Sequence, residues 1–382
     1  MWRNIVSTFL TLAIVLLVAA FGLLAWAQRE YRAPGPLAEA ICYRVDKGAT
    51  IGKVAGALTE AGAISSEYLF RAGADYSKKA HLLKFGSYLI EPHSSMEQIV
   101  DQLTVGGPAT CGNELNLRIG VRVNDAVLRE LDPASRDYVE VAKWRFAEEP
   151  APEALAKARD KGDLRLRVTL AEGVTSWQVV EGLKAIAELE GEIAAVPPEG
   201  SLAPDSYAIE KGTTRQSILD EMAARQAKIL AEAWEGRDAD LPYQTPEEAL
   251  VMASIIEKET GVPDERGQVA SVFVNRLRQG MKLQTDPTVI YGVTNGQGVL
   301  ERGLRQSELK RETPYNTYVI DGLPPTPIAN PGRASIEAAM HPEATQYLFF
   351  VADGSGGHAF AETLAEHNRN VAKWRAIEKQ QQ

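Results

Sequence analysis

The sequence predicts a mixed α+β chain that begins with a transmembrane helix and continues into a small and then a larger folded part. Three observations predict it: an uncharged apolar run near the N-terminus, a strand–helix–helix–strand pattern after it, and a second half in which amphipathic helices alternate with loops rich in Pro and Gly. With 382 residues, of which 45% are hydrophobic and 24% charged, the chain can build the cores of two or three domains.

The uncharged run from Ile5 to Ala27 is long enough, at about 1.5 Å per residue, to cross the roughly 30 Å hydrocarbon core of a bilayer. A secretory signal peptide is the alternative, but its apolar part is usually shorter, about 7–15 residues, and ends in a small-residue cleavage site. Here the run ends at Trp26, an aromatic residue typical of the membrane interface. We therefore expect residues 1–34 to hold an N-terminal tip, a retained anchor and a linker. The flanking charges do not set its orientation.

Residues 35–112 predict a small strand–helix–helix–strand unit with a further helix after it. Thr50 is a suitable N-cap for the first helix, and Gly62 ends it. The unit resembles a LysM-type glycan-binding module, a loose likeness that many small α+β units share. The expected elements are strands at Cys42–Val45 and Gly86–Ile90 and helices at Thr50–Ala61, Ser66–Ala74 and Ser95–Leu103.

The two cysteines of the chain, Cys42 and Cys111, lie near the two ends of that unit. Two are too few for a disulfide framework or a four-cysteine zinc site. They are either two unrelated thiols or, if this part of the chain is exported to an oxidising compartment, a disulfide. Their placement around one unit slightly favours the bridge.

Residues 113–163 are rich in charge, and we expect a connecting subdomain without assigned chemistry. Within it, Trp144–Asp160 has a helix-like pattern interrupted by polar residues. Residues 164–382 predict a larger mixed α+β domain, the catalytic domain if the chain is an enzyme. It opens with a strand at Leu164–Leu170 and a helix near Ser176.

The remainder of this domain alternates helices with loops. Turn-rich loops at Glu199–Tyr207 and Gly280–Gly332 are of the kind that lines a cleft. The expected elements are helices at Thr213–Trp234, Thr245–Thr260, Gln268–Leu277, Ile336–Met340 and Leu364–Gln381 and a strand at Tyr347–Ala352.

One glutamate, Glu259, extends the apolar face of its helix. Glu257, two residues earlier, lies on another side. Loss of water disfavours a charged carboxylate and raises its pKa, which suits a general acid. The alternative is a solvated side chain, or one paired with a nearby base such as Lys258 or Arg266. The apolar residues that precede Glu259 at helical spacing are Met252, Ile255 and Ile256.

Several other kinds of chemistry are disfavoured. The net charge of −10 argues against a nucleic-acid partner. His358 and His367 match no common metal-ligand spacing, so we expect no metal, and no cofactor is implied. The stretch Gly354–Gly356, with Ser355 at its centre, lacks the full nucleophile-elbow pattern of a serine hydrolase.

An ordered set of motifs follows Glu259. In order and spacing it resembles the YceG-like family of endolytic murein transglycosylases, closely over Glu199–Gln382, and the N-terminal span and the LysM-like unit fit as well. The chain departs from the family in two places: Leu202 and Ala203 stand where the family usually has aromatic residues, and the stretch 113–163 is longer than usual. Both departures bear on the fine shape of the substrate groove and not on the chemistry. The motifs are GVPDERGQVASVFVNRLRQGMKLQTDPTVIYGV at 261–293, YNTY at 315–318, GLPPTPIANPG at 322–332, FVADGSGGHAF at 350–360 and HN at 367–368.

The resemblance implies a peptidoglycan lytic transglycosylase, a carbon–oxygen lyase that cuts the β-1,4 bond between N-acetylmuramic acid and N-acetylglucosamine without water. The muramyl 6-hydroxyl attacks the anomeric carbon and leaves a 1,6-anhydro end. The family's essential glutamate is the second of its E-K-E motif and corresponds to Glu259, which the helical face also selects. One carboxyl can act first as an acid and then as a base, whereas ordinary glycosidases use two carboxylates.

The resemblance also implies substrate-binding residues in the loops, each with a structural alternative. Asp286 would hold substrate or tune Glu259, or else cap the turn before Pro287. The asparagines would donate to acetamido groups or hold turns, and the tyrosines would stack on sugars or pack. The expected substrate-binding residues are Gln284, Thr285, Asp286, Tyr315, Asn316 and Asn330.

A murein substrate implies a single-pass protein of the inner (cytoplasmic) membrane with a cytoplasmic tip and its catalytic domain in the periplasm, or at the cell exterior where there is no periplasm. The implied partners are glycan strands and, from the family, peptidoglycan synthases, beside which cutting would terminate strand elongation. Two other functions fit the residues. One is a two-carboxylate muramidase with Asp286 as the partner of Glu259, and the other is a non-catalytic glycan-binding scaffold.

Overall fold

The computed structural model describes residues 2–46, 48–104, 111–161 and 164–381. The chain forms two compact units. The first comprises Met1–Leu115, Val127–Lys143 and Ala151–Arg165, and the second comprises Asn116–Ala126, Trp144–Pro150 and Leu166–Gln382.

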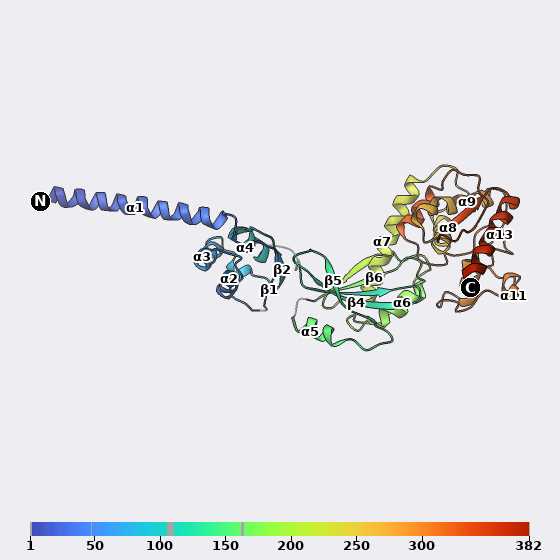
Figure 1. Cartoon of the computed structure of the whole chain (residues 1–382), viewed down its shortest axis with the longest axis horizontal. Helices are drawn as coiled ribbons and strands as arrows, with labels where there is room; N and C mark the ends of the chain where they lie inside the picture. Colours follow the sequence, from blue (N-terminus) through green and yellow to red (C-terminus); the bar gives the residue numbers. More distant parts are fainter. Residues whose placement is uncertain (1, 47, 105–110, 162–163, 382) are drawn as a thin grey trace. The chain divides into compact units, whose positions relative to one another are not determined.

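The first unit begins with the helix α1, Trp2–Arg32, drawn in blue in Figure 1. From Leu10 to Arg32 this helix is long and apolar enough to cross a membrane, a property that signal sequences near an N-terminus share. Its large apolar side chains, from Leu10 to Trp26, are exposed rather than packed in a core. The helix continues past Trp26 and ends at Arg32, so that the expected linker begins only after it.

The small unit has the expected strand–helix–helix–strand order. Its strands pair antiparallel, with Ile41 opposite Ile90, and its helices α2 and α3 begin at side-chain caps from Thr50 and Ser66. Its core is built around the fully buried Phe70. The elements are β1 Ile41–Val45, α2 Ile51–Glu60, α3 Glu67–Tyr76, the short 3₁₀ helix η1 Ala80–Leu82, β2 Gly86–Ile90 and α4 Met96–Thr104.

Cys42 and Cys111 form a disulfide with an S–S distance of 2.08 Å. Cys42 lies in β1, and the backbone N–H of Cys111 donates to the carbonyl of Ser87 in β2 at 3.1 Å. The bridge therefore holds the chain that follows α4 against the two-stranded sheet. Of the two possibilities that the sequence left open, the structure contains the disulfide.

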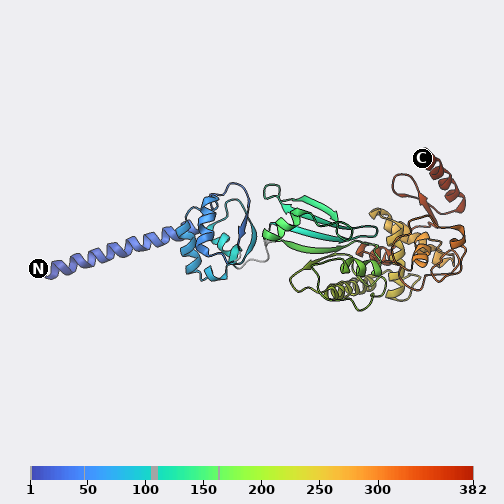
Figure 2. The same cartoon turned by 90° about the horizontal axis from the view of Figure 1, so that it is seen from below.

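A five-stranded sheet joins strands from both sides of the boundary expected at residue 163. Figures 1 and 2 show its green strands side by side. The expected connecting subdomain therefore contributes three strands to a sheet that it shares with the following domain. In order across the sheet the strands are β5 Tyr138–Arg145, β4 Asn124–Leu131, β3 Asn113–Ile119, β6 Arg165–Leu170 and β7 Ser206–Ile209.

The helix-like interpretation of Trp144–Asp160 is wrong in its first part. Trp144 lies in β5, where it is buried while its neighbours Lys143 and Arg145 are exposed, the alternation of a strand. The helix of this stretch is α5, Glu153–Lys161. Polar residues between the two elements mark a change of structure, not an irregular helix.

The helix α6, Ser176–Lys184, packs on the sheet after a capping box made by Thr175 and Gln178. Gly182 allows this contact, because a Cβ atom there would lie 2.8 Å from the side chain of Ile119 in β3. The loop that follows was expected to run to Tyr207, but β7 already begins at Ser206.

The C-terminal helices of the second unit surround α8, which packs against α7, α9, α10 and α12 (Figure 1). The expected helices are present with slightly shifted ends, but two were missed: α10 and the short α11 interrupt the expected loop from Gly280 to Gly332. The elements are α7 Arg215–Gly236, α8 Pro246–Glu259, the 3₁₀ helix η2 Pro263–Glu265, α9 Arg266–Arg278, α10 Asp286–Thr294, α11 Gln306–Leu309, α12 Arg333–Met340, β8 Phe349–Ala352, β9 His358–Ala361 and α13 Leu364–Gln381.

Candidate active site

Glu259 is the last residue of the central helix α8. Thr245 caps the start of this helix by accepting from the backbone N–H of Glu248, and Pro246 occupies the first turn. Residues 249 to 256 are buried without interruption, which fixes the helix in the core of the unit. Glu259 is partly exposed, so the helix carries its carboxyl group from the core to the wall of a cavity.

That cavity has a volume of about 180 Å³. It combines aromatic and aliphatic side chains with polar groups, an arrangement common in small-molecule sites. The residues that line it are Glu259, Phe273, Arg276, Leu283, Gln284, Asp286, Tyr318 and Phe350.

Burial raises the pKa of Glu259, and the nearby negative charge of Asp286 raises it further. The hydroxyl group of Thr285, which donates to Oε1 of Glu259, acts in the opposite direction, as do the charges of His358 and Arg276. The net direction is upward. A carboxyl group that keeps its proton towards neutral pH can act as a general acid.

Glu257 has a different role from Glu259. Its Oε2 accepts from the backbone N–H of Gly332 at 3.1 Å and from the hydroxyl of Ser335 at 2.7 Å. These groups belong to the start of α12, where the helix dipole favours a carboxylate. Glu257 therefore joins α8 to α12, and burial raises its pKa as it raises that of Glu259, so the two glutamates differ in their partners and not in the direction of their pKa shifts.

The two bases considered as alternative partners of Glu259, Lys258 and Arg266, have other partners. Lys258 donates from Nζ to the carbonyl of Gly173 at 3.1 Å. Arg266 lies 3.8 Å from a carboxylate oxygen of Glu172.

Gln284, Thr285 and Asp286, which the resemblance placed in the substrate groove, lie together beside Glu259. Gln284 and Asp286 line the cavity, and the buried Thr285 holds the carboxyl group of Glu259. Asp286 is the first residue of α10 and accepts from the hydroxyl of Tyr318 at 2.7 Å. It is therefore both a helix-start residue and a cavity residue, so the two alternatives for it do not exclude each other.

Tyr315, Asn316 and Asn330 do not line this cavity. Asn316 is buried and donates from Nδ2 to three backbone carbonyls of residues 308 to 311. Asn330 is also buried; its Oδ1 accepts from the N–H of Leu202, and its Nδ2 donates to the carbonyl of Val174. Both geometries fit the turn-holding alternative. Tyr315 packs against Tyr291, with its hydroxyl group 2.7 Å from that of Thr326.

Arg276 is a cavity residue that the sequence reasoning missed. Its guanidinium donates from Nε to the carbonyl of Leu348 at 2.7 Å and from Nη1 to that of Leu283 at 2.6 Å. Burial lowers the pKa of Arg276, whereas the nearby Tyr318 and Glu259 act to raise it. The available signal was an arginine within the apolar stretch of α9, because a buried arginine needs acceptors and often serves a site.

His358, which the sequence analysis considered only as a metal ligand and set aside, lies near the same cavity. Its Nδ1 is 2.7 Å from Oε2 of Glu265, and its backbone N–H donates to Oε1 at 2.8 Å. Phe350, which lines the cavity, meets the His358 ring edge-on at 5.2 Å between centroids. In the described ranges, no group of three or more His, Cys, Asp or Glu side chains is placed to hold a metal ion.

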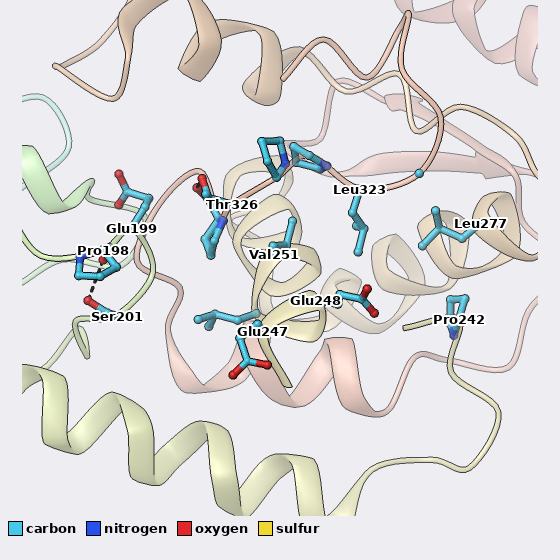
Figure 3. A pocket seen from close by; sticks show the side chains of 15 residues that line it. Pro198, Glu199, Ser201, Pro242, Glu247, Glu248, Val251, Leu277, Leu323 and Thr326 are labelled. Carbon is cyan, nitrogen blue, oxygen red and sulfur yellow. Dashed lines mark hydrogen bonds between the residues drawn. The ribbon is translucent and has the colours of Figure 1, made fainter. Parts of the chain in front are cut away.

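A larger pocket of about 810 Å³ lies beside the first half of α8, away from Glu259 (Figure 3). Val251 of α8, Leu323 and prolines 324, 325 and 327 give it an apolar wall. Glu199 lies at one side, where Oε1 accepts from the N–H of Ser176 at 2.8 Å. Burial raises the pKa of Glu199.

A carboxyl group whose pKa burial raises, beside a cavity of mixed polarity, is characteristic of acid–base enzymes. The chain belongs to the YceG-like family, whose model matches residues 43–373.

Curated relatives bear the name endolytic murein transglycosylase. The protein of Bacillus subtilis (strain 168) is 29% identical over 331 residues, which cover 86% of this chain and 83% of that protein. The protein of Streptococcus pneumoniae serotype 2 (strain D39) is 27% identical over 337 residues, 86% of this chain but 57% of its own length. Among solved structures, a YceG-like protein from Listeria monocytogenes is 25% identical and aligns over 87% of this chain and 98% of its own, with a TM-score of 0.45.

Proposed function

We propose that this protein is an endolytic peptidoglycan lytic transglycosylase with Glu259 as its catalytic acid and base. The observation that carries the proposal is the desolvated carboxyl group of Glu259, held by Thr285 at the wall of a cavity. Membership of the YceG-like family and the name that its curated relatives bear support the same activity.

In the proposed reaction, protonated Glu259 donates its proton to the glycosidic oxygen as the bond from that oxygen to C1 of N-acetylmuramic acid breaks. The departing N-acetylglucosamine gains a free 4-hydroxyl group. The resulting carboxylate then takes the proton of the muramyl 6-hydroxyl, whose oxygen bonds to C1. A 1,6-anhydro end forms, Glu259 regains its proton, and no water is consumed.

The neighbouring residues have matching proposed roles. Gln284 and Asp286, both exposed at the cavity, face the substrate, and Asp286 favours the protonated form of Glu259. Thr285 orients the carboxyl group for both proton transfers. Tyr315 does not line this cavity. Its hydroxyl group contacts Thr326, which lines the larger pocket, so any contact of Tyr315 with sugar would be made at that pocket.

We further propose that α1 is a retained membrane anchor and that the rest of the chain faces the periplasm or the cell exterior, where murein lies. The disulfide between Cys42 and Cys111 supports an oxidising compartment. The small unit would bind glycan as a LysM-like module. Cutting within nascent strands would terminate their elongation, which suggests peptidoglycan synthases as partners.

The deciding experiment is mass spectrometry of muropeptides released from purified peptidoglycan by the full-length protein and its Glu259→Gln variant. The wild type should release anhydro-muropeptides, and Glu259→Gln should lose at least about a hundredfold in rate, the usual contribution of a general acid. Glu257→Gln is the matched control. It keeps an oxygen to accept from Gly332 and Ser335, so it should retain activity.

Three other results of this experiment would contradict the proposal. Reducing ends in place of anhydro ends would mean a muramidase that uses water. Equal cleavage by the wild type and Glu259→Gln would remove Glu259 from the mechanism. No cleavage by any form, with intact binding to glycan, would favour the scaffold.

A further inference from the structure

Two helices of the first unit, α1 and α3, are packed directly against each other. The ring of Tyr31 in α1 contacts Gly73 in α3. A Cβ atom at position 73 would lie only 2.2 Å from this ring, so only glycine allows the two helices to approach this closely. Next to this contact, Ser65 donates to a carboxylate oxygen of Glu30 at 2.9 Å. The small unit is therefore attached rigidly to the end of the apolar helix.

The helix α3 runs back along α1 towards the apolar part of that helix. Its N-terminal side is near Glu30, through Ser65, whereas its last residue, Tyr76, shares a cleft of about 480 Å³ with Leu24 and Ala27. Leu24 precedes Glu30 by six residues, or about 9 Å of helix. The C-terminal end of α3 thus lies at the level of the exposed apolar side chains of α1, on the α1 side of the small unit (Figure 1).

The segment from Tyr76 to Phe85 combines exposed aromatic and aliphatic side chains with lysines. Tyr76 is 86% exposed, Phe85 60% and Leu82 45%, values that are high for large apolar residues. Three lysines and one aspartate lie between positions 75 and 85. Lys79 pairs with Asp101, whereas Lys78 is exposed at a positive φ of 57°. Aromatic side chains mixed with lysines are typical of the membrane interface, where rings sit at the headgroup level and ammonium groups contact lipid phosphates.

We propose that this segment, Tyr76–Phe85, is a second membrane contact, which lies in the headgroup region of the leaflet through which α1 leaves the bilayer. Anionic phospholipid is the occupant that the exposed ammonium group of Lys78 selects. The inference rests on the proposed role of α1 as a retained anchor. The contact holds the small unit flat on the membrane rather than free above it, because α1 and α3 cannot swing apart without breaking the contact of Tyr31 with Gly73.

The test measures quenching by lipid nitroxides of a genetically encoded fluorescent amino acid, which leaves the disulfide intact. The label replaces Tyr76, or Tyr68 at the other end of α3, in full-length protein reconstituted in vesicles of phosphatidylethanolamine and phosphatidylglycerol. Tyr68 is a matched control, because it is 79% exposed on the same helix. Headgroup nitroxides should quench position 76 at least about threefold more than position 68, since eight residues separate the two by roughly 12 Å. Equal quenching at the two positions would overturn the proposal.

A third label at Val18, with nitroxides deep in the acyl chains, tests the anchor separately. Quenching at Val18 without quenching at position 76 would leave α1 spanning the bilayer and overturn the second contact. No quenching at Val18 would overturn both. Lys78→Glu should weaken the quenching at position 76 about twofold or more in anionic vesicles, because it replaces a basic residue near the negatively charged surface by an acidic one. Lys53→Glu, an exposed lysine of α2, should leave it unchanged.

Discussion

The hydroxyl of Thr285 opposes the burial that raises the pKa of Glu259. In Thr285→Val this donor is lost, so the pKa of Glu259 should rise further and the protonated acid should persist to higher pH. We therefore expect the alkaline limb of the pH–rate profile to move to higher pH. We also expect turnover to fall about five- to tenfold, the equivalent of the roughly 1 kcal/mol of one hydrogen bond. Thr285→Ser should restore both, and a Thr285→Val profile that overlies the wild type would show that the bond has no such role.

Residues of the site were predictable where a single helix or a short loop decided their place. Helical spacing separated Glu259 from Glu257, and the family resemblance singled out the short loop that contains residues 284–286. Arg276 was missed because its acceptors, Leu283 and Leu348, come from two other segments. The residue was named in the case of Asn330, but its partner could not be, since Val174 is 156 residues away.

At the level of elements, the contact between α6 and β3 depends on Gly182. Gly182→Ala should lower the free energy of unfolding by about 1–3 kcal/mol, because the added methyl group meets Ile119 in a filled core. Gly56→Ala is the control. Gly56 lies within α2, and the nearest atom to its Cβ position is a carboxylate oxygen of Glu67 at 4.0 Å, so alanine there should stabilise by about 0.5–1 kcal/mol. Urea unfolding measures both, and an equal sign for the two substitutions would contradict this account of α6.

Helices were predicted better than strands because their period and caps are local. Thr50, Ser66 and Thr245 each begin a helix close to its expected start. The sheet was not predictable, because β3 pairs with β6 across a long insertion and no local signal records that pairing. The helix α10 was missed because Asp286-Pro287 looks like a turn, although proline is equally at home in the first turn of a helix.

For the whole molecule, the disulfide between Cys42 and Cys111 encloses a long stretch of chain, with a sequence separation of 69. Closing such a loop stabilises by about 4 kcal/mol in the chain-entropy estimate, so Cys42→Ser with Cys111→Ser should destabilise by a comparable amount. Both cysteines belong to the first unit, so the effect should remain there. Amide hydrogen exchange should quicken in α2 and α3 but not in α8. Equal loss of protection in α8 would show that the two units unfold together.

The backbone conformation of Gln284 lowers the stability of the folded chain. Its φ of +52° places a side chain in the left-handed region, which disfavours residues other than glycine by roughly 1 kcal/mol. The chain thus gives up stability at a position where the side chain faces the cavity. A laboratory selection for heat tolerance alone would therefore favour Gln284→Gly, and if Gln284 has its proposed role, the selected variants would be more stable but would bind glycan more weakly. Thermal robustness would then be a misleading guide to improving this enzyme.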